Sequence, residues 1–317
     1  VKKVKTPADK KQFIRLPWKI YSDFPYWVPP LISERKKFLN PRINPFLKES
    51  EVDLFLVVSG DQEPVGRIAF VINHAHNKTY SERVGFFGML ETINDRQVSD
   101  LLLNTAETWC RKKKFNKLVG PVNLSTNHEC GLLVDGFDVP PVVGIPYNPR
   151  YYLNFLEGWG LSKSKDLVSL RLELPHMPEY LESAMSRLRK KERFSVRPLR
   201  LNKFDKEIDT IWDIYNDAWS DNWGFLPMSR EEFKYAANQI RSFIQPEFCF
   251  ISEVKGEPVG FAITLPDINM VLKKMNGRLF PFGWIRFLWN KKNIKLYRVV
   301  ALGVKKKYRR LGIDAAL

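Results

Sequence analysis

Residues 297–317 read YRVVALGVKKKYRRLGIDAAL. The apolar run 297–304 predicts a buried strand, the basic residues after it predict a turn, and 311–317 is typical of a helix start. The first amides of a helix lack partners within the helix, and the helix dipole favours negative charge there. Because Arg309 and Arg310 add charge-assisted donors and Gly312 permits close approach, the stretch predicts an anion site. A surface turn before an amphipathic helix is the alternative.

The same order of strands occurs twice along the chain. The tetrapeptide Glu-Pro-Val-Gly stands at 63–66 and again at 257–260, each time between two apolar runs, which predicts two β-hairpins. A further apolar strand follows each hairpin, over 84–90 and over 297–304. We therefore interpret the chain as two copies of one structural unit.

A hairpin, a third strand and an Arg-x-x-Gly-x loop that opens a helix resemble the GNAT superfamily of acyl-CoA N-acyltransferases. The loop matches at Arg309 and Gly312 and departs at Asp314, where the family has Gly or Ala. The resemblance implies an α+β fold of tandem GNAT-like domains, with mixed, mostly antiparallel sheets flanked by helices. It also implies that the loop amides hold the CoA pyrophosphate and that the strand offers amides to the thioester carbonyl. The implied cofactor-binding residues are Leu302, Gly303, Val304, Arg309, Arg310, Leu311, Gly312, Ile313, Asp314 and Ala315.

We predict three parts of the chain. These are a degenerate GNAT-like domain over 1–175, a linker helix over 176–193, and a GNAT-like acyl-CoA-binding domain over 194–317 that is incomplete at its C-terminus against the family pattern. The first copy is degenerate because an acidic segment, and no Arg-x-x-Gly loop, follows its third strand. Tyr151 and Tyr152 match a Tyr-bearing helix of the family, but in this copy we expect them to pack in the core.

The resemblance implies direct transfer from acetyl-CoA or another acyl-CoA to an amine, and N-acetyl transfer is the expected reaction. A base must take a proton from the amine. Asp267 is the candidate, because it ends a hairpin strand and precedes a long segment without acids; a turn-capping role after Pro266 is the alternative. A second class stays open, in which a catalytically silent module uses its basic surface to bind an anionic membrane, a protein or nucleic acid.

The composition of the chain bears on its domain number, its compartment and its metal content. The 317 residues are 44% hydrophobic, which is enough for two domains with cores. The three cysteines, Cys110, Cys130 and Cys249, have no disulfide or zinc spacing, so we expect a cytoplasmic protein without a metal. His74 and His76 lack an evident third ligand. The sequence has no signal-peptide pattern and no apolar run of the ~18–20 residues that a membrane span needs.

The net charge of +16 is concentrated late in the chain. From Ile268 through Ile313 there are thirteen Lys and Arg residues and no Asp or Glu. This field attracts anions, and we expect CoA as the ligand; an anionic membrane is a further possible partner, and nucleic acid is a weaker one because no base-recognition motif is present. Within it, residues 266–295 form an insertion with Trp284, Trp289, Arg286, Lys291 and Lys292. Such a segment suits a lipid-like amine acceptor or an anionic membrane; packing between domains is the alternative.

Overall fold

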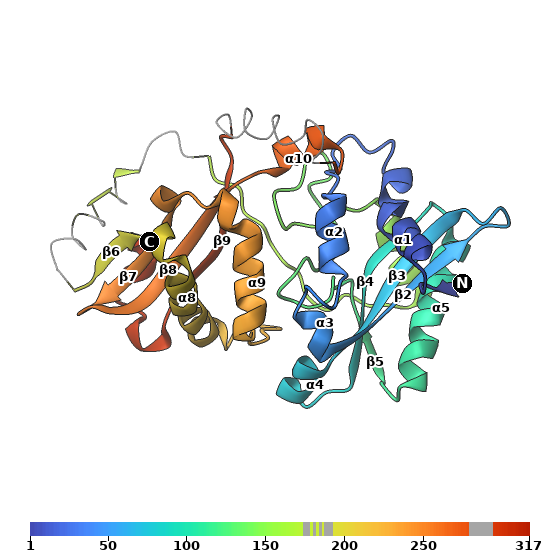
Figure 1. The fold of residues 1–317 in the computed structure, drawn as a ribbon, viewed down its shortest axis with the longest axis horizontal. Coiled ribbons are helices and arrows are strands. Elements are labelled where there is room, and N and C mark those ends of the chain that lie inside the picture. The colour runs from blue at the N-terminus through green and yellow to red at the C-terminus, as the bar shows by residue number, and fades with distance from the viewer. Residues whose placement is uncertain (174–177, 180–181, 184–185, 187–192, 279–293) are drawn as a thin grey trace. The chain divides into compact units, whose positions relative to one another are not determined.

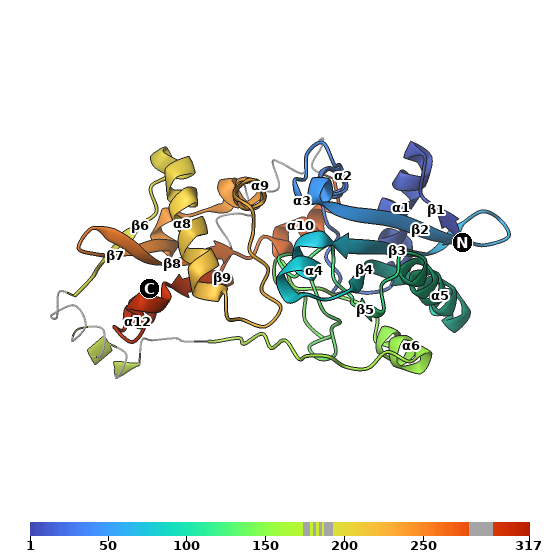
Figure 2. The same ribbon diagram turned by 90° about the horizontal axis from the view of Figure 1, so that it is seen from below.

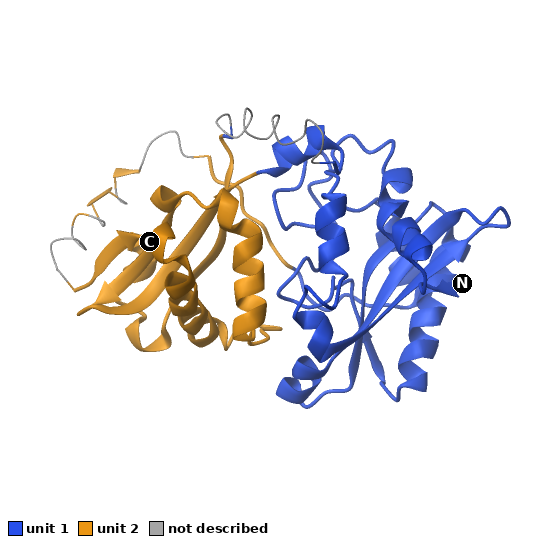
Figure 3. Cartoon of the chain, in the orientation of Figure 1, with its two compact units in different colours: residues 1–166, 268–294 blue, residues 167–267, 295–317 orange. Residues whose placement is uncertain are grey.

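The computed structural model describes residues 1–173, 178–179, 182–183, 186, 193–278 and 294–317. The chain forms two compact units, residues 1–166 with 268–294, and residues 167–267 with 295–317 (Figure 3). Each unit is built on its own β-sheet.

The sheet of the first unit has the strand order β1-β2-β3-β4-β5 (Figure 1). Neighbouring strands are antiparallel, except that β4 and β5 run parallel. The strands are β1 (Lys2–Lys3), β2 (Ser50–Val58), β3 (Pro64–Asn73), β4 (Val84–Thr92) and β5 (Lys117–Val119).

Helices cover both faces of this sheet (Figure 2). Side chains alternate along a strand, so Ala69 and Val71 of β3 pack with α1, whereas Phe70 and Ile72 pack with α5. The helix α1 starts at a capping box in which Thr6 and Asp9 satisfy each other's amides. The helices are α1 (Pro7–Ile20), α2 (Ile32–Phe38), α3 (Phe46–Glu49), α4 (His74–Tyr80), α5 (Arg96–Lys112), α6 (Tyr151–Trp159) and, from far along the chain, α10 (Asn269–Met275).

The second unit has an antiparallel sheet in the order β6-β7-β8-β9. Its strands are β6 (Ser195–Pro198), β7 (Cys249–Val254), β8 (Glu257–Pro266) and β9 (Tyr297–Val304). Its α-helices are α8 (Phe204–Trp219), α9 (Arg230–Ile240) and α12 (Ile313–Ala316). Within its described residues, this unit also has the 3₁₀ turns η1 (Leu201–Lys203), η2 (Arg241–Phe243), η3 (Pro246–Phe248) and η4 (Lys306–Tyr308).

The core of the second unit lies between the sheet and α8. Ile211, Ile214 and Tyr215 of α8 pack against Phe261 and Ile263 of β8. A smaller cluster, formed by Val259, Val304 and Ile313, holds α12.

The predicted fold class is confirmed: both sheets are mostly antiparallel and flanked by helices. Both predicted hairpins form, β2 with β3 and β7 with β8, and each is followed by a third antiparallel strand. The domain boundaries at 175 and 194 stay predictions, because most of 176–193 lies outside the described residues.

Candidate active site

The predicted site begins on β9, the last strand of the second sheet in the described chain. The pairing of β9 with β8 shifts by one residue, because Ala301 faces Ile263 while Val299 faces Thr264. Val300 is therefore the extra residue of a β-bulge, and a bulge turns backbone groups out of the ladder. Val299 is 59% exposed and Val300 and Leu302 are each 37% exposed. On the side away from β8, the strand β9 thus offers an extended backbone with apolar side chains.

The loop after β9 bends sharply before α12. Arg310 has φ 67° and Gly312, the N-cap of α12, has φ 80° and ψ 17°. Between Arg310 and Gly312, no amide donates to a backbone carbonyl of the described chain. The first amides of α12 have no partner within the helix either. This gives a short run of available N–H donors, which is the arrangement that a pyrophosphate requires.

The basic residues at the start of this loop are held by α8. Lys305 Nζ lies 2.8 Å from Asp213. The amide of Lys306 donates to Asp217 at 2.7 Å, and its Nζ lies 2.7 Å from Asp221. The three acids are spaced i, i+4 and i+8, so they follow one face of α8 and its continuation. Much of the positive charge predicted for the loop is therefore compensated inside the second unit.

Arg309 also makes a structural contact. Its Nη2 donates to the carbonyl of Ala218 at 2.5 Å. Lys307 and Arg310 are both exposed, and Lys307 Nζ lies 5.5 Å from the centre of the Tyr308 ring. Arg310 is consequently better placed than Arg309 to meet an incoming anion.

Gly303 stands where packing leaves little room for a side chain. A Cβ at this position would lie 3.0 Å from Phe261 Cε1 and 3.1 Å from Ala218 Cβ. The bare Cα lets the end of α8 approach β9. There, Trp219 Nε1 donates to the Leu302 carbonyl at 3.1 Å.

Asp267 is buried, at 2% exposure, directly after β8. Its amide donates to the Leu296 carbonyl at 2.8 Å. Arg298 on β9 is placed opposite Leu265; burial lowers the pKa of Arg298, and the negative charge of Asp267 acts to raise it. The charges of Asp267 and Arg298 therefore act on each other near the start of β9. The role of Asp267 as a base stays a prediction.

In the first copy the corresponding region is filled by the chain itself. Pairing between β3 and β4 also shifts, between Arg67 and Ala69, so that Met89 and Leu90 together stand opposite Ile68. The Met89 amide donates to Asn123 Oδ1 at 2.7 Å. A Cβ on Gly88 would lie 2.0 Å from the Val122 carbonyl oxygen, so backbone occupies the space beside this strand. These contacts agree with a structural first copy.

Tyr151 and Tyr152 secure the end of β4. The Tyr151 hydroxyl donates to the Thr92 carbonyl at 2.8 Å, and the Thr92 amide donates to the Tyr152 hydroxyl at 2.8 Å. Tyr152 in turn donates to Glu91 Oε2 at 2.9 Å, as Tyr21 does at 2.8 Å. Burial raises the pKa of both Tyr152 and Tyr21 well above 10, so the two hydroxyls stay protonated.

The residue that sequence reasoning missed here is Glu91. Burial raises its pKa, while the nearby charge of Arg67, 3.4 Å away, lowers it. Arg67 also donates to the Phe13 carbonyl at 2.6 Å. The one signal in the sequence is an acid at the end of an otherwise apolar strand, 84–92.

The weaker candidates are used in other ways. His74 and His76 lie 3.3 Å from Glu51 and 3.4 Å from Glu82. Over the described residues, no three His, Cys, Asp or Glu side chains are grouped as metal ligands would be. The His128 ring bonds Ser125 Oγ at 2.8 Å. Burial raises the pKa of the Cys130 thiol, which disfavours a reactive thiolate at this position.

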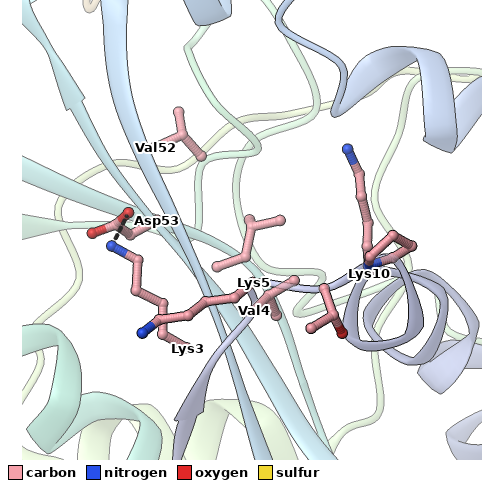
Figure 4. A pocket seen from close by; sticks show the side chains of 9 residues that line it. Lys3, Val4, Lys5, Lys10, Val52 and Asp53 are labelled. Carbon is pink, nitrogen blue, oxygen red and sulfur yellow. Dashed lines mark ion pairs between the residues drawn. The ribbon is translucent and has the colours of Figure 1, made fainter.

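The first unit also has a cavity of about 410 Å³ beside the start of α1 (Figure 4). It is lined by Lys3, Val4, Lys5, Thr6, Pro7, Lys10, Val52, Asp53 and Leu54. Lys3 pairs with Asp53 at 2.7 Å, and Lys10 donates to the Leu39 carbonyl at 2.7 Å. None of the site residues predicted from the sequence lines it.

Two expectations concern the membrane. The aromatic and basic residues Trp284, Trp289, Arg286, Lys291 and Lys292 lie outside the described residues. Where the structure describes the chain, it contains no helix that is both long enough and apolar enough to cross a bilayer.

Comparison with known proteins identifies two relatives by sequence. Bacterial ceramide synthase of Caulobacter vibrioides is 38% identical over 310 residues, which are 96% of this chain and 80% of that protein. Protein YghO of Escherichia coli K12 is 34% identical over 316 residues, or 98% of this chain and 80% of that protein. No family model matches the sequence.

A solved structure supports the fold. The GCN5-related glucosamine N-acetyltransferase region of a fungal multi-domain GH3 β-N-acetylglucosaminidase superposes with a TM-score of 0.53. The match covers 99% of this chain and 32% of that one at 12% identity, so it concerns the fold alone. The GNAT-like fold predicted from the sequence is confirmed.

Proposed function

Because the chain belongs to the family of the bacterial ceramide synthase of Caulobacter vibrioides, we propose that it N-acylates a lipid-like amine with a long-chain acyl-CoA. The chain is an N-acyltransferase of the GNAT fold. The two substrates, a long-chain acyl-CoA and a lipid-like amine, are what we propose beyond this enzyme class. A ceramide is an N-acylated long-chain amino alcohol, so a relative of that name favours an amphipathic amine and an acyl chain longer than acetyl.

The observation that carries the proposal is the course of β9. Its outer side is apolar and exposed at Val299, Val300 and Leu302, and it runs directly into the loop with available amides at 310–314. An acyl-CoA needs both features in this order. Its phosphates need N–H donors, and its pantetheine and acyl chain need an extended backbone beside apolar side chains.

We propose the following steps on these residues. The amides of the loop hold the pyrophosphate, and Arg310 adds charge-assisted bonds. The bulge at Val300 turns an amide toward the thioester carbonyl, whose oxygen gains negative charge when the amine attacks. A new N–C bond forms, the C–S bond breaks, and the thiolate of CoA leaves.

The amine must lose a proton as it becomes an amide. Asp267 is the proposed acceptor, since it is a buried carboxyl group directly after β8. Asp267→Asn keeps the shape of the side chain and removes the base. We expect the acidic limb of the pH–rate profile to disappear in this variant, while a merely structural role would lower stability and leave the profile unchanged.

The test of the function uses the purified chain with acetyl-CoA or palmitoyl-CoA as donor. The acceptors are sphinganine and a short soluble amine. Thiol release and mass spectrometry of the product report turnover. We expect palmitoyl-CoA with sphinganine to give the N-acyl product at the highest kcat/KM. Acetyl-CoA as the preferred donor would overturn the long-chain proposal, and CoA binding without any product would favour the catalytically silent module.

A further inference from the structure

The helix α10 joins the two parts of the chain in an unexpected way. It begins two residues after Asp267, at the end of the second sheet, yet it belongs to the first unit. Two side-chain hydrogen bonds hold it to the rest of the first unit. Asn269 Nδ2 donates to the Pro141 carbonyl at 2.7 Å, and Trp18 Nε1 donates to Asn276 Oδ1 at 2.9 Å. The side chains of Val271 and Met275, both on α10, are buried. One side of α10 is therefore packed within the first unit, and its opposite side faces solvent.

The end of α10 is fixed just as closely. Gly277 has φ 76°, and a Cβ there would lie 2.4 Å from Trp18 and 3.1 Å from the Pro30 carbonyl. The Gly277 carbonyl accepts the amide of Ile32 at 3.0 Å. Because both ends are bound, the exposed face of α10 keeps one orientation within the first unit.

That outward face combines cations with an apolar side chain. Lys273, Lys274 and Arg278 are all exposed, and Met270 is 54% exposed. Lys273 Nζ lies 5.9 Å from the centre of the Tyr26 ring, so an aromatic side chain borders the cations. No Asp or Glu occurs anywhere between 268 and 313. We call these five residues the α10 surface.

We propose that the α10 surface binds the anionic headgroups of a lipid bilayer and so brings the enzyme to an amphipathic acceptor. The second part of this statement rests on the proposed function; the first does not. Each basic residue near an anionic membrane strengthens binding about fivefold. Lysine and arginine stems with a neighbouring tyrosine and methionine suit the boundary between headgroups and acyl chains.

Vesicle sedimentation of the full chain tests the surface. The vesicles are phosphatidylcholine alone, or phosphatidylcholine mixed with phosphatidylglycerol. The test variant carries Lys273→Gln, Lys274→Gln and Arg278→Gln. The matched control carries Lys36→Gln, Lys37→Gln and Arg42→Gln, which removes the same charge from exposed positions of the first unit.

We expect the wild type to prefer anionic vesicles and to lose that preference as the screening length falls from about 10 Å at 0.1 M salt to about 3 Å at 1 M. The test variant should bind at least tenfold more weakly, and the control less than threefold. Equal losses in the two variants would show a general charge effect and overturn the assignment. Binding of the test variant as tight as that of the wild type would overturn it as well.

A second readout separates this proposal from the transferase proposal. Turnover of the short soluble amine needs no membrane, so the test variant should keep wild-type kcat/KM with that acceptor. Its turnover of an acceptor embedded in anionic vesicles should fall in parallel with binding. If the chain transfers no acyl group but still shows the vesicle result, the surface stands and the proposed reaction fails.

Discussion

Gly312 offers the sharpest test of the loop after β9. It has φ 80° at the N-cap of α12, in the left-handed region that L-residues occupy at a cost of about 1–2 kcal/mol. Gly256, in the turn between β7 and β8, has φ 81°, and a Cβ there would meet nothing within 4 Å. Gly312→Glu and Gly256→Glu therefore impose the same backbone cost on the same unit.

The two variants differ in what the new carboxylate meets. At 312 it would stand among the amides that we expect to bind pyrophosphate. A unit charge about 5 Å from a phosphate repels it by about 3 kcal/mol at an effective dielectric constant of about 20, which is a loss of more than about 100-fold in affinity. At 256 no such loss is expected. Gly312→Ala shares the backbone cost without the charge and should fall between them.

Isothermal titration with CoA measures the affinity, and denaturant unfolding measures the stability. We expect similar loss of stability in both glutamate variants, with CoA binding lost only in Gly312→Glu. The same titration gives the stoichiometry, which should be one CoA per chain because backbone fills the region beside β4 in the first copy. If Gly312→Glu binds CoA as tightly as Gly256→Glu does, the loop is not the phosphate site.

Two more predictions concern the first unit. Asn123→Ala leaves the Met89 amide without its acceptor, so the free energy of unfolding should fall by about 1–3 kcal/mol while kcat stays unchanged; a large loss of kcat would contradict a structural first copy. Burial lowers the pKa of His128 to about 4. The unfolded chain thus binds a proton that the folded chain does not as pH falls from about 6.5 toward 4, and stability should drop by about 3 kcal/mol over that window. Denaturant unfolding of His128→Asn should lack this slope, and an unchanged slope would refute the assignment.

Much of the second unit could be predicted from sequence, because its signals are local. The repeated Glu-Pro-Val-Gly turn and its flanking apolar runs predict hairpins wherever they occur, and the Arg-x-x-Gly spacing locates the helix start at Gly312. The partners of the basic residues could not be predicted in this way. Arg309 meets Ala218 and Lys306 meets Asp217 across about ninety positions, and such pairs depend on how α8 lies on the sheet.

The first unit shows the same limit. An apolar strand ending near Glu91 predicts a boundary, but it does not predict that Tyr21, Arg67 and Tyr152 gather around that carboxylate from three distant parts of the chain. The sequence also does not predict that Ile268–Ile294 belongs to the first unit. Nothing in the composition of 268–278 distinguishes a helix packed on that unit from a surface loop.

The path of the chain through α10 has a consequence for how the protein comes apart. A protease that cleaves within 176–193 would leave one fragment carrying the second sheet and also α10, a helix that belongs to the fold of the other fragment. Separation would then require Val271 and Met275 to leave their buried sites and Trp18 to lose its bond to Asn276. In the nicked chain the first unit would therefore still depend on a helix that the other fragment supplies, so that the two fragments are expected to stay together.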